Sequence, residues 1–253
     1  MPTTVTIIGI EGLPEVQPGA PLAGLLRAAC TDQGTPLQNG DVLVVTQKVV
    51  SKAEGQVLDL KTVTPSPLAL EYARAWEKDP RVVEIALAEA KRVVRMDSGV
   101  LITETKHGFI CANSGVDASN VGHADADWVV LLPDDPDASA RRLRDEIRSA
   151  TGAEIAVIIS DTFGRPWREG AGNVAIGVAG MAPLWDYRGT PDNDGREMHS
   201  TVIAVADEVA AASELVTNKL SRVPAAIIRG YPFIHSEEGI RPMLRERGKD
   251  LFR

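Results

Sequence analysis

The stretch EIAVIISDTFGRPWREGAGN, residues 154–173, decides the fold class. Residues 155–159 are all apolar, which predicts a strand buried inside a sheet. The sequence becomes polar at Ser160, so we expect Asp161 and Thr162 to project from the carboxyl end of this strand, at the start of a loop that runs to Asn173. Ligands of open α/β sheets usually bind at that edge. The stretch therefore predicts a buried sheet with a site at its edge.

The rest of the chain alternates between apolar segments and turn residues. Short β-branched runs predict further strands at residues 5–10, 41–46, 128–132, 174–178 and 225–228, and a hairpin of residues 100–103 and 108–111 around His107. Apolar residues at helical spacing predict helices at residues 22–30, 68–77 and 136–150, and within 201–219. The tail, residues 235–253, is polar and has little to bury.

One more helix has a clear start. Asp79 is its expected cap, Pro80 its first residue, and the apolar positions at helical spacing are Val83, Leu87, Ala90 and Val94. Together these elements predict an α/β protein of mixed α+β character. With 253 residues and 44% hydrophobic composition, we expect one domain over residues 1–253, with the Pro-Ser-Pro segment 65–67 as a candidate internal boundary.

The overall charge excludes some partners. The formal net charge is −8 and the sequence pI is about 5.1, so we do not expect nucleic acid binding, although a few local cations could still hold a small anion. No apolar run is long enough to span a bilayer, and the N-terminus lacks a signal peptide. Two cysteines in apolar stretches, Cys30 and Cys111, are typical of buried thiols in a reducing compartment. We therefore expect a cytoplasmic protein without a membrane partner.

The common motifs for nucleotide, zinc and nucleophile chemistry are missing. The sequence contains no P-loop, no G-x-G-x-x-G after a strand, no H-E-x-x-H or spaced Cys/His cluster, and no G-x-S-x-G. The four histidines share no local spacing and are predicted to be turn or surface residues: His107, His123, His199 and His235. The aromatic residues Trp167, Trp185 and Tyr187 could stack on a ligand, but packing is the commoner role.

Two loops concentrate oxygen donors. Residues 113–122 contain Asp117 and Asn120 among small residues, and residues 160–173 begin with Asp161 and Thr162. Carboxylate and hydroxyl oxygens suit Mg²⁺ or Mn²⁺, so Asp117 and Asp161 could meet at a metal ion. The alternative is two unrelated turn aspartates that each bond to their own backbone, and spacing alone favours it.

Several cationic residues could also belong to a functional site. Lys48 and Lys52 follow a predicted strand and would share one side of the chain as either helix or strand. One of them could neutralise phosphate, or the two could be a solvated pair. Arg165 and Arg168 belong to the loop that bears Asp161; they could clamp an anionic substrate or simply cover the loop.

These residues make the sequence resemble the coenzyme F420:L-glutamate ligase family over nearly its whole length. The matching segments keep the family's order and spacing: GLPEV, DVLVVTQKVVSKAEG, GVLITETKHGFICANSGVDASNVG, LLPDDPDASARRLR, VIISDTFGRPWREG, AVADEVAAASELV and PAAIIRG. The resemblance implies a family-specific, non-Rossmann fold and an intertwined homodimer. The chain ends at Arg253 and so resembles the stand-alone form, which has no flavin domain.

The resemblance also implies an activity: GTP-dependent addition of L-glutamate to a deazaflavin F420 precursor, then of another glutamate through a γ-carboxylate. It implies two divalent ions, Mg²⁺ or Mn²⁺, and leaves a K⁺ ion open. Asp117 and Asp161 match ligands of one ion and Thr162 a ligand of the second. The residues that match the nucleotide site are Leu13, Pro14, Glu15, Val16, Gln47, Lys52, Asn120, Thr217, Asn218 and Ser221.

Two positions depart from the family pattern. Gln47 replaces a serine found in some relatives, and Lys219 falls where some relatives carry a glutamine metal ligand. An ammonium has no lone pair for a metal, so Lys219 is left out of the metal set. The expected reaction activates a carboxylate as an acyl phosphate and needs no protein nucleophile. The alternatives are a ligase for another carboxylate acceptor and a non-catalytic nucleotide- or metal-binding module.

Overall fold

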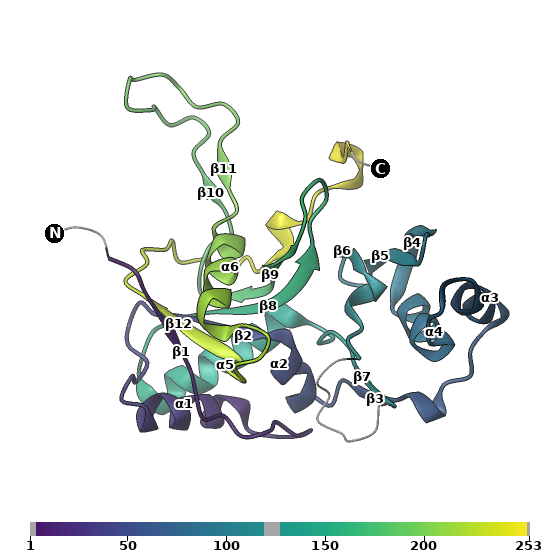
Figure 1. Ribbon diagram of the computed structural model, residues 1–253. Coiled ribbons are helices and arrows are strands. Elements are labelled where there is room, and N and C mark those ends of the chain that lie inside the picture. Colours follow the sequence, from purple (N-terminus) through teal and green to yellow (C-terminus); the bar gives the residue numbers. More distant parts are fainter. Residues whose placement is uncertain (1–3, 119–126, 252–253) are drawn as a thin grey trace.

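A computed structural model describes residues 4–118 and 127–251 of the chain. Its centre is a five-stranded sheet in the order β1-β12-β2-β8-β9 (Figure 1). The strands are β1 (Thr6–Gly9), β12 (Ala225–Arg229), β2 (Val42–Thr46), β8 (Ala156–Gly164) and β9 (Ala171–Ala179). Only β2 and β8 run parallel; the other pairs are antiparallel. The predicted mixed α/β class is therefore confirmed.

The parallel pair forms the middle of the hydrophobic core. Val42–Val45 on β2 and Ala156–Ile159 on β8 are buried, because helices cover both faces of the sheet. Helices α1 (Leu22–Asp32) and α5 (Pro136–Thr151) cover one face, and α6 (Val205–Thr217) covers the other (Figure 1). The short helix α2 (Gln47–Ala53) follows directly from β2 at the edge of the sheet.

Local sequence explains where α5 begins and ends. The side chain of Asp135 caps the helix by accepting a hydrogen bond from the Ala138 amide at 2.9 Å. Gly152 ends it in a left-handed conformation, with φ of 75°. The helix start lies so close to β9 that a side chain at Gly177 would meet the Pro136 carbonyl oxygen at 2.4 Å. A glycine is therefore required where the helix crosses the strand.

A second group of elements lies beside the sheet and has its own hydrophobic cluster. It contains helices α3 (Pro67–Trp76) and α4 (Pro80–Ala88), a two-stranded sheet of β3 (Val57–Asp59) and β7 (Trp128–Val130), and a three-stranded sheet of β4 (Ala90–Asp97), β5 (Val100–Thr105) and β6 (Ile110–Ala112). Leu60 and Ala69, on either side of the Pro-Ser-Pro segment, belong to the same cluster.

Two sequence predictions were wrong about an element's extent. The helix that begins at Pro80 ends at Ala88, so Ala90 and Val94 lie on strand β4 instead of on the helix. Strand β4 pairs with β5, and its residues alternate between half-buried and exposed, a period of two that favours a strand. The loop predicted at 160–173 is mostly a hairpin: β8 continues through Asp161 and Thr162 to Gly164, and β9 begins at Ala171.

Two segments extend beyond the sheet. The short strands β10 (Trp185–Asp186) and β11 (Val202–Ile203), which the sequence analysis missed, form the base of a projecting arm (Figure 1). The C-terminal tail contains two 3₁₀ turns, Arg241–Met243 and Arg247–Lys249. Part of the tail is buried: Ile240 packs into the main core, and its amide donates a hydrogen bond to Asp137.

The remaining sequence predictions can be compared with individual side chains. His199 and His235 are exposed, and His107 is a half-buried turn residue that stacks on Phe109; His123 lies outside the described residues. Trp185 stacks on Tyr231 and meets Tyr187 edge-on, a packing role. Burial raises the pKa of Cys30 to about 11 and that of Cys111 to about 12, as expected for inert thiols. Within residues 4–118 and 127–251, no helix is long and apolar enough to cross a membrane.

Candidate functional site

A cavity of about 770 Å³ opens at the carboxyl ends of the parallel strands β2 and β8. The structure therefore places a cavity at the sheet edge where the sequence predicts a site. Of the predicted site residues, the cavity wall contains Leu13, Pro14, Glu15, Val16, Gln47, Lys52, Asp117, Asp161, Thr162, Thr217 and Asn218. Ser221 is not part of this wall, and Asn120 lies outside the described residues.

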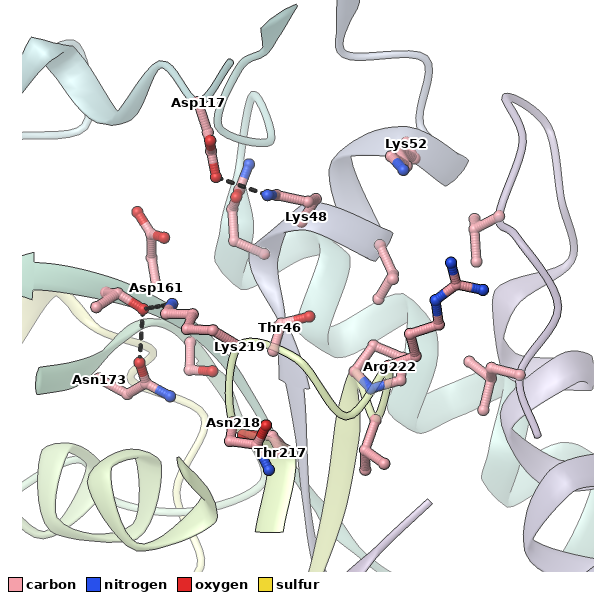
Figure 2. A pocket seen from close by; sticks show the side chains of 18 of the residues that line it. Thr46, Lys48, Lys52, Asp117, Asp161, Asn173, Thr217, Asn218, Lys219 and Arg222 are labelled. Carbon is pink, nitrogen blue, oxygen red and sulfur yellow. Dashed lines mark hydrogen bonds and ion pairs between the residues drawn. The ribbon is translucent and has the colours of Figure 1, made fainter. Parts of the chain in front are cut away.

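The two aspartates come from different groups of elements and meet at this cavity (Figure 2). Asp117 is fixed by its backbone, which exchanges hydrogen bonds of 3.0 and 2.8 Å with Val130 of β7. Asp161 is held by β8, in register with Val174 of β9. Burial raises the pKa of Asp161 to about 6, and the negative charge of Asp117 adds to this effect. The two carboxylates are therefore close enough to repel each other.

Lys48 and Lys52 lie on helix α2 and both reach the cavity. The Nζ atom of Lys48 lies 2.8 Å from Oδ2 of Asp117. The Nζ atom of Lys52 lies 2.5 Å from Oε1 of Glu15, and Lys52 is only 6% exposed. The solvated-pair interpretation is therefore wrong for Lys52. Burying an ammonium is costly unless it has an anionic partner, which Glu15 supplies here.

Thr162 is the centre of a hydrogen-bonded chain. Its hydroxyl donates to Oδ1 of Asn173 at 2.8 Å and accepts from the ammonium of Lys219 at 2.6 Å (Figure 2). The amide of Asn173 then donates to Oε2 of Glu214 at 2.8 Å. The chain links strands β8 and β9 to helix α6 and to the loop after it, and so fixes the direction in which the Thr162 oxygen faces.

Gln47 lines the cavity but is 2% exposed, and its amide nitrogen is already used. It donates to Oγ of Ser51 and to the Leu131 carbonyl oxygen, both at 2.7 Å. A neutral amide has two N–H donors, so both are engaged inside the protein. Any contact from this side chain to a ligand must therefore come from its carbonyl oxygen.

The loop after α6 curls over the cavity. The side-chain oxygen of Asn218 accepts hydrogen bonds from the amides of Leu220 and Ser221, both at 3.0 Å, which holds the loop in a tight turn. The Ser221 hydroxyl bonds back to the Thr217 carbonyl oxygen, so this side chain serves the turn and not the cavity. The same loop brings Lys219 and Arg222 into the wall.

Sequence reasoning missed several wall residues, Thr46, Ser160, Asn173, Glu214 and Arg222, and it named Lys219 only to leave it out of the metal set. Most lie on β9, α6 and the loop after α6, and no local motif marks them. Ser160 is 1% exposed, and its hydroxyl finds no hydrogen-bond partner within residues 4–118 and 127–251. Arg165 and Arg168 are absent from the wall that these residues form; Arg165 donates to Gly170 and Glu169 within its own turn.

The donor set fits one divalent ion. The described residues contain no cluster of three or more His, Cys, Asp or Glu side chains able to hold a metal. Two facing carboxylates, Asp117 and Asp161, are nevertheless the donors that Mg²⁺ uses when phosphates and waters complete its shell. Among the described wall residues, four carboxylates balance four cations, so the cavity can accept an anion although the whole chain is acidic.

Comparisons with known proteins give the family of the chain. Residues 11–230 match the model of the family described as F420-0:Gamma-glutamyl ligase. The chain is 47% identical over 252 residues to the coenzyme F420:L-glutamate ligase of Methanothermobacter thermautotrophicus, which covers 98% of this chain and 99% of that protein. The ligases of the same name from Methanopyrus kandleri and Methanocaldococcus jannaschii are 44% and 43% identical, over 96% and 86% of this chain and 97% and 86% of those proteins.

The fold and the site define an α/β protein whose cavity combines paired carboxylates with cations. Within that class, the matches over nearly the whole length give the family directly. The chain belongs to the F420-0:gamma-glutamyl ligase family.

Proposed function

We propose that this protein is a GTP-dependent ligase that joins L-glutamate to the terminal carboxylate of a deazaflavin F420 precursor, and then adds a second glutamate through the γ-carboxylate of the first. Family membership supports the reaction class and both substrates, since the relatives are named coenzyme F420:L-glutamate ligases. One observation supports placing this reaction in the cavity: Asp117, Asp161, Lys48 and Lys52 all line its wall.

The cations of the wall are suited to a triphosphate. Lys48 and Lys219 lie near the two aspartates, and Lys52 and Arg222 lie further along the same wall (Figure 2). Charge-assisted hydrogen bonds from such groups to phosphate oxygens are among the stronger polar contacts in proteins. The nucleotide would then extend between residues 13–16 and the loop after α6, with Asn218 among its contacts.

Asp117 and Asp161 would hold a divalent ion, Mg²⁺ or Mn²⁺, which supplies charge neutralisation to the phosphates when it is bound. Lys48 is then displaced from Asp117 or shares it, because one of the two Asp117 oxygens already accepts the Lys48 ammonium. A displaced Lys48 remains on the wall and can pair with a phosphate oxygen instead. The residues therefore exchange one internal ion pair for two contacts to the ligand.

The proposed chemistry follows from the substrates. A carboxylate is a poor electrophile, because an amine cannot expel oxide from it. An acceptor carboxylate oxygen attacks the γ-phosphorus of GTP, GDP leaves, and an acyl phosphate forms. The glutamate nitrogen then attacks the acyl carbon, the C–O bond to phosphate breaks, and the amine loses a proton as inorganic phosphate departs. Positioning and charge stabilisation supply most of this catalysis, so no protein nucleophile is required.

Two parts of the proposal rest on the family resemblance alone: guanine as the base and an intertwined homodimer as the assembly. Light scattering coupled to gel filtration measures the assembly, and a mass of one chain would contradict the dimer. Competition between GTP and ATP for the site measures the base preference.

The function is tested by combining purified protein with F420 precursor, L-glutamate, GTP and Mn²⁺, followed by mass spectrometry of the product. The proposal predicts glutamyl adducts of the precursor and stoichiometric phosphate release. A ligase for another carboxylate would release phosphate only with a different acceptor. A binding module would release none above background with any acceptor.

A further inference from the structure

The wall of the cavity contains a cation that the chain itself provides, on an exposed loop. Lys219 lies in the loop after α6, and its ammonium donates to the Thr162 hydroxyl oxygen at 2.6 Å (Figure 2). Asp161, the residue before Thr162 on β8, lines the same wall as Lys219. Lys219 therefore contacts one of the two neighbouring residues of β8 that line the cavity.

The position of Lys219 is defined by the hydrogen-bonded chain behind Thr162. The Thr162 hydroxyl has one hydrogen, which it donates to Asn173, and Asn173 is held in turn by Glu214. With its hydrogen used, the Thr162 oxygen can act toward the cavity only as an acceptor. Glu214 belongs to α6, which ends at Thr217, so the hydrogen-bonded chain is anchored on the helix that leads into the loop of Lys219.

This arrangement does not fit a second divalent ion. The family resemblance implies such an ion at Thr162, where it would use a lone pair of the same oxygen that accepts the Lys219 ammonium. An ion bound there would lie beside a like charge in a partly enclosed cavity, where repulsion is stronger than in water. Lys219 cannot help to bind it, because an ammonium has no lone pair. The second ion and the ammonium are therefore alternatives.

We propose that Lys219 replaces the second divalent ion, so that the site uses one divalent ion at Asp117 and Asp161 and one ammonium at Thr162. The assignment of the anion held between them as the triphosphate of GTP rests on the proposed function. The metal count does not rest on it, because the competition between an ammonium and an ion at one oxygen needs no reaction.

The first test counts Mn²⁺ ions bound to the protein alone, from the loss of the free-ion signal in electron paramagnetic resonance. Lys219→Gln removes the charge and supplies a carbonyl oxygen, so this variant should bind one ion more than the wild-type chain. Lys219→Arg keeps the charge and is the matched control, which should bind the wild-type number. Adding Thr162→Val to Lys219→Gln should remove the additional ion.

Equal Mn²⁺ counts for the wild-type and Lys219→Gln chains would overturn the proposal. So would a wild-type count that falls when Thr162→Val is introduced alone, because Thr162 would then already bind an ion beside Lys219. Circular dichroism confirms that each counted variant is folded. A wild-type protein that forms no glutamyl product but passes this count would contradict only the proposed function.

A second readout is the dependence of GTP binding on metal. At limiting Mn²⁺, Lys219→Gln should bind GTP about 10- to 100-fold more weakly, the loss expected for one charge-assisted contact. Excess Mn²⁺ should restore binding in Lys219→Gln, because an ion then occupies the position of the ammonium. A merely structural role for Lys219 predicts a loss that metal does not repair, and that result would overturn the proposal.

Discussion

The ammonium of Lys48 lies 2.8 Å from the carboxylate of Asp117, although the two residues come from a helix at the edge of the main sheet and from a loop of the neighbouring group of elements. This ion pair in the cavity wall links helix α2 to the segment that bridges to β7. It also balances the charge of Asp117, which we propose as a metal ligand, in the protein without ligand. A metal ion bound at Asp117, as proposed, would compete with this internal partner, so its binding would be coupled to a rearrangement of Lys48.

Removing either carboxylate should abolish ligation. Asp117→Asn and Asp161→Asn keep shape and hydrogen bonding but lose a metal-binding charge, so we expect product formation to fall at least about 100-fold at limiting Mn²⁺. Asp186→Asn is the control, because Asp186 is exposed on the arm and pairs only with Arg188 among the contacts the structure describes for it. Near-normal activity of both cavity variants would remove these residues from the metal site.

Lys52 should contribute to GTP affinity. Lys52→Met keeps the packing of the buried stem but removes the ammonium, so we expect GTP binding to weaken by about 1.5–3 kcal/mol, the range for hydrogen bonds to charged groups. Isothermal titration calorimetry measures the change. Lys106→Met, on the exposed hairpin turn and paired with Glu89, is the control and should leave affinity unaltered. Unchanged affinity in Lys52→Met would return Lys52 to a purely structural pairing with Glu15.

The pH dependence of stability should report Asp161. Its pKa of about 6 in the fold lies above the ordinary value, chiefly because the group is buried. Between about pH 4 and pH 6 the folded protein keeps a proton that the unfolded chain has lost, so the free energy of unfolding falls as pH rises through this window. In metal-free protein, Asp161→Asn should abolish that fall and be about 3 kcal/mol more stable than wild type at pH 7.

Asp186→Asn supplies the control of opposite sign for this titration. Its pKa is lowered to about 2 by hydrogen bonds from Arg188, so its contribution is present at pH 5 and above and is lost only in acid. Denaturant unfolding in EDTA at several pH values measures both variants. The assignment would be contradicted if the free energy of unfolding of the wild type rose between pH 4 and pH 6 and Asp161→Asn abolished that rise.

The crossing of α5 and β9 should tolerate no side chain. A Cβ at Gly177 would lie 2.4 Å from the Pro136 carbonyl oxygen, so Gly177→Ala forces backbone movement and should cost about 2–4 kcal/mol of stability. Gly164→Ala, on the same hairpin, is the control, because no described atom lies within 4 Å of the added Cβ. Thermal unfolding compares the two, and equal melting temperatures would contradict the close contact.

The parts of the fold that were predictable are those in which local pattern and tertiary environment agree. The apolar run at 155–159 became the buried strand β8, and Pro80 began a helix. The continuation of β8 through Thr162 was not predictable, because its polar residues are held by pairing with β9 and not by burial. Val94 was assigned to a helix because its spacing fits one, but pairing with β5 decides for a strand.

The candidate site also has residues that could be predicted from the sequence and residues that could not. Asp161 and Lys52 could be proposed because each follows a strand with turn or helix signals. Lys219, Asn173 and Glu214 could not, since only the docking of α6 against β9 brings them together. Their roles depend on contacts between segments separated by more than 40 residues.

The most direct test of the proposed reaction uses an acceptor whose terminal carboxylate carries ¹⁸O. In the acyl phosphate mechanism one carboxylate oxygen becomes the bridge to phosphorus and leaves with the phosphate when the glutamate amine attacks. We therefore predict that each glutamyl amide formed is matched by one inorganic phosphate containing ¹⁸O, measured by mass spectrometry, and that GTP is hydrolysed only slowly when acceptor is omitted. Unlabelled phosphate during productive amide formation would contradict activation through an acyl phosphate.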